Sequence, residues 1–294
     1  MTFLPVLLAL SFVADRAVTP PPAALVERFA LDPFYEKCVD ADGFPIVGSA
    51  YASDVALLEA AHLIDRMLSH QPALRAALID SRTRFVVMAR TEMTTDVPEH
   101  AHLRPTDYWD RRARGLGATP EAPAVSCGEE NLLCLDGDPY AAENILIHEF
   151  AHAIHHTGLT RTDPTFDGRL YATFLKARGA KLWEGKYAAT NRAEYWAEGV
   201  QSWFDTNRVN DHDHNHVDTR DELKEYDPGL AALCAEVFGE GDWRYAKPAT
   251  RAVASHFEGY DAASATPFAW PADLPPLSKE NREQHEKAKR RDDG

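Results

Sequence analysis

The fold of this chain is constrained most strongly by one segment that is apolar on nearly every side. The run ENILIHEFAHAIHH follows Asp138-Pro139, a pair that suits the N-cap and the first position of a helix, and it stops at Gly158, a common C-terminal residue. Its apolar residues point in most directions, so we expect this helix to be buried in the domain core. The same run contains histidines and a glutamate, and such groups are costly to bury without partners.

Those polar residues form the motif His148-Glu149-Phe150-Ala151-His152. Residues four apart share one helix face, so both imidazoles can bind a single metal ion. Glu149 is rotated by one residue, which places its carboxylate beside the open position of the metal, where a general base acts. The motif therefore predicts a zinc site with His148 and His152 as ligands. The alternative, a solvated face with unrelated histidines, is disfavoured by the apolar neighbours.

A catalytic zinc site needs a third protein ligand and a fourth position for water. The extended motif HExxHxxGxxH is absent, because His155 and Gly158 occupy the places of its glycine and its third histidine. The later segment AEYWAEGVQSWF offers Glu194 and Glu198, one helical turn apart among aromatic residues. Glu194 is the candidate third ligand, and Glu198 is the candidate partner that orients a ligand imidazole. A solvated acidic helix face is the alternative.

The charge of the chain limits its partners. The 294 residues carry a formal net charge of -15, which argues against binding to nucleic acid or to anionic membranes. No stretch reaches the roughly 20 apolar residues that a membrane span needs. A shorter apolar run, FLPVLLALSFVA, is followed by small residues and then by prolines. We interpret residues 1–19 as a signal peptide, which predicts a secreted or periplasmic protein.

The chain has four cysteines, and an even number suits two disulfides in an oxidising compartment. The cysteine count therefore agrees with the predicted export of the protein. The segment CGEENLLC resembles a short polar loop, which favours a Cys127–Cys134 bridge. A Cys38–Cys234 bridge would follow by elimination. The alternative is four reduced thiols packed as small hydrophobic residues.

The remaining patterns predict one α+β domain, with helices packed on a small twisted sheet. Arg84 to Ala89 is the best strand, and the segment from Tyr108 to Thr119 is interpreted as a strand and turn at a sheet edge, where Arg112 to Thr119 could pair with an extended substrate. Helices are expected over 53–68 and 167–178, and from a cap at Thr190 or Asn191. The domain would span 20–270, before a Pro-rich and charged tail at 271–294.

Taken together, HEFAH and AEYWAEGVQSWF resemble segments of the gluzincin peptidases, above all the catalytic domain of anthrax lethal factor and the lethal-factor-like domains of secreted proteins. The likeness spans roughly residues 140–206. It implies a zincin-like metallopeptidase domain with a mixed sheet, and it assigns Glu194 to zinc. It also implies that Tyr187, seven residues before that glutamate, assists catalysis.

These observations predict a secreted zinc metallopeptidase that hydrolyses a protein or peptide substrate. Glu149 would take a proton from water activated by Zn²⁺, and Tyr187 would help to stabilise the oxyanion. One alternative is a catalytically silent zinc-binding module of the same fold that binds a protein or cell-wall partner. Another is a zinc hydrolase acting on a non-peptide amide or ester. The run from Asp211 to His216 is expected to be a solvated loop, with a second metal site as the alternative.

Overall fold

The computed structural model describes residues 16–251 and 255–278. Residues 1–15 of the predicted signal peptide and residues 279–294 of the predicted tail therefore lie outside the described residues. Within the described part, the chain forms helices around one small mixed sheet, so the predicted α+β class is confirmed. No helix in this part is both long and apolar enough to cross a membrane.

Within the described residues, five strands form the sheet, in the order β1-β2-β3-β5-β4. Their bounds are Lys37–Ala41 (β1), Phe44–Gly48 (β2), Arg84–Met88 (β3), Gly115–Leu116 (β4) and Ala124–Gly128 (β5). Strands β2, β3 and β5 are parallel, whereas β1 and β4 run antiparallel to their neighbours. The predicted strand is thus β3, fully buried at the centre of the sheet. The predicted edge segment is only partly a strand: Gly115–Leu116 form β4, but residues 108–112 are helical, so that part of the prediction is wrong.

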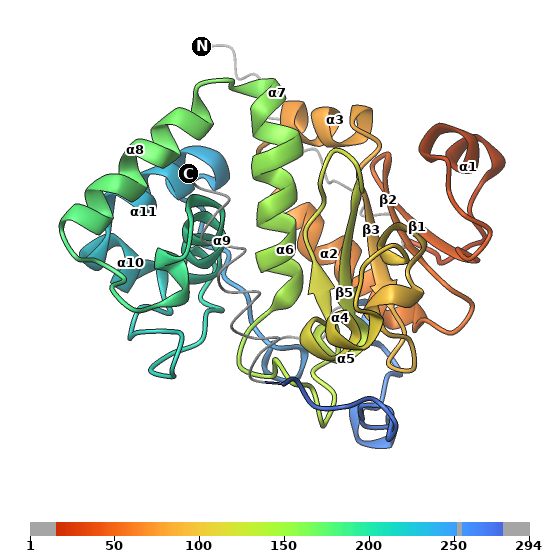
Figure 1. The fold of residues 1–294 in the computed structure, drawn as a ribbon. Helices are drawn as coiled ribbons and strands as arrows, with labels where there is room; N and C mark the ends of the chain where they lie inside the picture. The colour runs from red at the N-terminus through yellow and green to blue at the C-terminus, as the bar shows by residue number, and fades with distance from the viewer. Residues whose placement is uncertain (1–15, 252–254, 279–294) are drawn as a thin grey trace, which may run out of the picture.

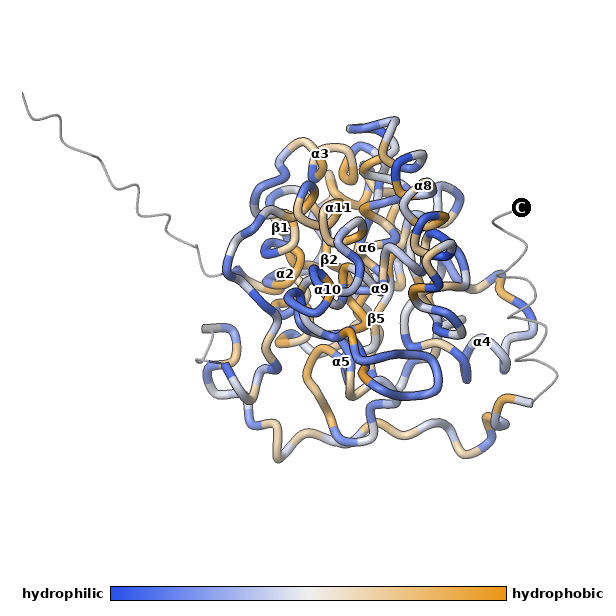
Figure 2. The backbone as a smooth tube through the Cα atoms, turned by 90° about the vertical axis from the view of Figure 1, so that its left-hand side faces the viewer, coloured by the Kyte–Doolittle hydropathy of each residue, from blue (hydrophilic) through white to orange (hydrophobic). Residues whose placement is uncertain are grey.

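Helices cover the sheet and then extend away from it (Figure 1). Their bounds are Ala23–Phe29 (α1), Asp54–Met67 (α2), Pro72–Asp80 (α3), Thr106–Arg112 (α4), Glu129–Leu132 (α5), Ile145–Ala153 (α6), Thr160–Thr162 (α7), Phe166–Gly179 (α8), Arg192–Trp203 (α9), Arg220–Tyr226 (α10) and Pro228–Phe238 (α11). Helix α6 stands between the sheet and the group formed by α8 to α11 (Figure 1). Hydrophobic segments gather in the interior around β2, β5 and α6 (Figure 2).

The central helix differs from the prediction at both of its ends. It begins at Ile145, because the Asn144 side chain accepts a hydrogen bond from the Ile147 amide and caps the helix there. The segment that begins at Asp138-Pro139 is instead held in turns by the Asn131 side chain. At the other end, the helix continues through Gly158 as a π-helical turn over Ile154–Leu159.

Gly158 therefore does not end the helix but lets it pack closely. A Cβ atom at this position would lie 2.4 Å from Leu74 Cδ1 on α3. A side chain here would force the end of Leu74 to shift, so the glycine allows the close approach of the two helices.

The predicted disulfides are wrong, since the four cysteines are free thiols. The segment CGEENLLC is not a loop that closes on itself: Cys127 lies within β5, and α5 separates it from Cys134. Cys134 Sγ instead lies 3.8 Å from Tyr245 Oη. Cys38 is buried on β1 and Cys234 is buried on α11, as in the alternative of reduced thiols packed in the core.

Candidate metal centre

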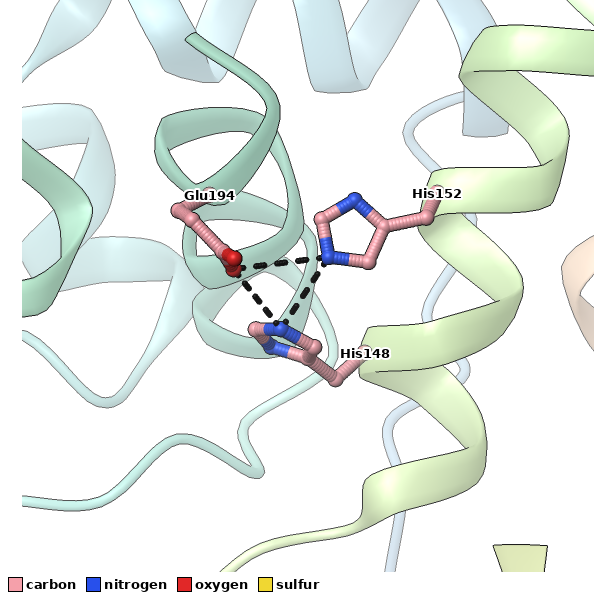
Figure 3. A group of neighbouring side chains, drawn as sticks. All are labelled: His148, His152 and Glu194. Carbon is pink, nitrogen blue, oxygen red and sulfur yellow. Dashed lines mark hydrogen bonds and ion pairs between the residues drawn. The ribbon is translucent and has the colours of Figure 1, made fainter. Parts of the chain in front are cut away.

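Helix α6 presents both histidines of the motif on one side (Figure 3). His148 is buried, and His152 and Glu149 are half-buried. The Nε2 atoms of the two imidazoles lie 3.3 Å apart. Two ring nitrogens pointing at one position, one helical turn apart, form the geometry that the spacing of the motif predicts.

Helix α9 brings the third group to the same position. Its cap residue, Asn191, accepts a hydrogen bond of 2.8 Å from the Glu194 amide, which sets the start of the helix and the direction of this glutamate. Two residues after Glu194, the Trp196 indole donates a hydrogen bond of 3.0 Å to the Ala151 carbonyl of α6. The two helices that carry the three groups are thus joined directly.

The three side chains converge on one small space. Glu194 Oε2 lies 3.2 Å from His148 Nε2 and 3.4 Å from His152 Nε2. A tetrahedral zinc ion, at about 2.0–2.2 Å from nitrogen and oxygen ligands, requires ligand atoms about 3.3–3.5 Å apart. The spacing of the three atoms therefore suits such an ion. Among the described residues, this trio forms a group of His, Cys, Asp or Glu side chains close enough to hold a metal.

The charges of the trio are strongly coupled. Burial would lower the pKa of His148, but its hydrogen bond to Glu194 and the charges of Glu149, Glu194 and Glu198 raise the pKa to about 10. Burial would raise the pKa of Glu194, but His152 and His148 outweigh it and lower that pKa. Without an ion, a proton compensates the buried carboxylate, and a metal cation can take the place of that proton.

The other ring nitrogen of His148 has a partner that the sequence did not reveal. His148 Nδ1 lies 2.8 Å from Gln201 Oε1, and Gln201 Nε2 donates a hydrogen bond of 3.0 Å to Glu143 Oε2. Since an amide oxygen only accepts, His148 donates its Nδ1 proton to Gln201, which leaves Nε2 as the nitrogen available to a metal ion. The predicted partner, Glu198, lies farther from the same nitrogen, with its Oε1 at 3.7 Å.

A cavity of about 180 Å³ opens beside the trio. Glu149 and Tyr187, the two predicted catalytic residues, line it together with Arg112, Gly115, Glu143 and Arg208. The Tyr187 ring lies 6.3 Å from the His148 ring, centroid to centroid. The Glu149 carboxylate and the Tyr187 phenol therefore line the same cavity as His148.

The edge strand β4 passes close to the catalytic helix. A Cβ at Gly115 would lie 3.2 Å from Glu149 Cγ, and one at Gly117 would lie 2.7 Å from His152 Cβ. Glycine at both positions lets the backbone of this edge approach α6 without a side chain between them. Among the described residues, β4 is the last strand of the sheet and pairs with β5 alone, so one of its sides is an unpaired edge.

The histidine-rich segment is only partly the solvated loop that the sequence predicts. The His212 side chain is 94% exposed, but that of His214 is 3% exposed and lies between Asp211 and Glu198. The evenly spaced histidines of this segment look alike in the sequence. Their exposure differs because His214 is in contact with Glu198 on α9.

The comparisons of the chain with known proteins found a likeness among solved structures only. No family model matches it, and no curated protein does either. Among solved structures, it is similar to the Pro-Pro endopeptidase PPEP-2 from Paenibacillus alvei, with 19% sequence identity and a TM-score of 0.45. The similarity covers 66% of this chain and 97% of that one. A likeness this distant assigns no function.

Proposed function

We propose that the chain is a zinc-dependent peptidase of the gluzincin type, with zinc held by His148, His152 and Glu194. The observation that carries this proposal is the distance of 3.2–3.4 Å between each pair of their ligand atoms. That spacing suits a tetrahedral ion with three protein ligands and one position open. A zinc ion bound there would lower the pKa of water towards about 7 and polarise a substrate carbonyl.

Glu149 is the proposed general base and then general acid. It follows a ligand histidine on α6 and lines the cavity, but it is not a member of the ligand trio. Its carboxylate can accept a proton from the attacking water and pass that proton to the leaving amine. Glu198 lies one turn beyond Glu194, and with its Oε1 3.7 Å from His148 Nδ1 it is the proposed partner that helps to orient this imidazole.

An extended peptide is the proposed substrate. The free edge of β4 passes along α6, and a peptide can add to such an edge through main-chain hydrogen bonds. The cavity beside Glu149 supports an active site over a silent binding module, since a silent module requires a blocked cleft.

Tyr187 is the proposed donor to the oxyanion that forms during hydrolysis, because its phenol lies beside His148 and lines the same cavity. We expect Tyr187→Phe to lower kcat by about 10²- to 10³-fold, the cost of one lost oxyanion donor, with KM nearly unchanged. Steady-state kinetics on a cleaved peptide would measure this. The matched control is Tyr171→Phe, at an exposed position on α8. An unchanged kcat for Tyr187→Phe would remove the tyrosine from the mechanism.

The function itself is tested by digesting a peptide library with the purified protein, with and without a zinc chelator, followed by mass spectrometry. We expect cleavage products that disappear with the chelator and return when zinc is added back. Zinc binding without any cleavage would instead favour the silent module. Cleavage of amide or ester reporters but of no peptide would favour a non-peptide hydrolase.

A further inference from the structure

In the segment from Asp211 to His216, one histidine, His214, is buried and held by hydrogen bonds. The Asp211 carboxylate accepts hydrogen bonds of 2.8 Å from the amides of Asp213 and His214, and it lies 2.7 Å from His214 Nδ1. This aspartate therefore fixes both the turn and the imidazole ring. His214 is buried, whereas His212 two residues earlier is exposed.

The other side of the His214 ring faces the helix that supplies the third ligand. His214 Nε2 lies 3.3 Å from Glu198 Oε2, and Asn207 Nδ2 donates a hydrogen bond of 3.1 Å to the same oxygen. The second oxygen of Glu198 lies 3.7 Å from His148 Nδ1. Glu198 thus stands between a proposed metal ligand and His214.

Charge explains why a histidine occupies this place. Glu198 is buried, and a buried carboxylate needs a compensating charge or strong donors. Both ring nitrogens of His214 lie near carboxylate oxygens, with Nδ1 2.7 Å from Asp211 Oδ1 and Nε2 3.3 Å from Glu198 Oε2. Burial and the nearby Arg208 lower the pKa of His214, but its contacts with Glu198 and Asp211 outweigh them and raise it.

The same turn also holds the segment of Tyr187. The Tyr187 amide donates a hydrogen bond of 2.8 Å to the Asp213 carbonyl. The neighbouring Lys186 ammonium donates to the carbonyls of Asp211 and His212, at 3.1 and 3.3 Å. The turn that buries His214 is therefore attached both to α9 and to the residue proposed to stabilise the oxyanion.

We infer that His214 is a positioning residue of the metal centre: clamped between Asp211 and Glu198, it holds that carboxylate beside His148 and keeps the 211–214 turn against Tyr187. The inference rests on the proposed zinc site, which it deepens. It assigns the histidine-rich run to support of that centre, since both nitrogens of His214 face carboxylates rather than an open position.

The experiment measures zinc affinity and thermal unfolding of the full chain. Zinc affinity is determined by competition with a chromophoric chelator, and Tm is measured with and without zinc. We expect His214→Leu to weaken zinc binding by about 10- to 100-fold, as the loss of an outer partner does in other metal sites. The rise in Tm that zinc produces should shrink accordingly. His214→Gln, whose amide can still donate to Glu198, should recover part of the affinity. His212→Leu is the matched control and should bind zinc like the wild type.

The outcomes separate this inference from the proposed function. A wild-type protein that binds no zinc would overturn the metal centre itself. A wild type that binds zinc, with unchanged affinity in His214→Leu, would overturn the role of His214 only. So would an equal loss of Tm in the zinc-free and zinc-bound forms, because a purely structural contact acts on both. If His214→Leu does not fold, Asp211→Asn keeps an oxygen acceptor for the turn but removes the charge, and wild-type zinc affinity in that variant would equally overturn the inference.

Discussion

Replacing Glu149 by glutamine is expected to leave zinc bound while peptide hydrolysis falls by about 10²- to 10⁴-fold. Glutamine has nearly the same shape, but its amide cannot accept the proton of the attacking water. Zinc should persist because the ligand atoms belong to His148, His152 and Glu194. Metal analysis of the purified variant and kcat/KM on a cleaved peptide would measure the two effects separately.

The control for this variant is Glu184→Gln, the same chemical change at an exposed glutamate. It should retain full activity. If Glu149→Gln hydrolyses peptides at the wild-type rate, the general base is another group. If it loses both zinc and activity, the glutamate contributes to the metal site itself rather than to proton transfer.

Replacing Glu194 by alanine is expected to remove zinc and activity together. The loss of a direct ligand should weaken zinc binding by more than the 10- to 100-fold that an outer partner contributes. It also leaves two facing imidazoles without the carboxylate that compensates a proton or a cation between them. The helix cap at Asn191 survives, because it uses only the Glu194 backbone amide.

Chelator competition would measure the zinc affinity, and circular dichroism of the zinc-free protein would establish that the variant is folded. Glu149→Gln is the matched control, since it alters a neighbouring carboxylate that is not a ligand. A Glu194→Ala protein that binds zinc with wild-type affinity would show that the third ligand has been misassigned.

The parts of the site that depend on local geometry could be predicted from the sequence. The spacing of His148 and His152 places them on one helix face whatever the rest of the chain does. The helix that carries Glu194 was recognisable from its cap at Asn191 and its aromatic residues. The resemblance to a known family selected Tyr187, and the structure places it at the same cavity.

The parts that depend on long-range packing could not be predicted. Gln201 reaches His148 from 53 residues away, and nothing in its local sequence distinguishes it from a surface glutamine. The start of α6 differs from the prediction because Asn144 caps the helix, whereas the Asn131 side chain holds Asp138 in a turn. His214 resembles its exposed neighbours in sequence and differs from them only through a partner on α9. The predicted Cys127–Cys134 bridge is wrong because Cys127 lies in β5 and helix α5 separates it from Cys134.

The hydrogen bond from the Trp196 indole to the Ala151 carbonyl has a consequence for how the proposed centre would acquire its ion. It joins the two helices that carry the proposed ligands through groups outside the trio, so we expect the binding position to be assembled as the chain folds, before any ion enters. Loading would then exchange a proton for a cation within an existing frame. We therefore expect that an ion bound there can be withdrawn, or replaced by another of similar size, without unfolding the chain.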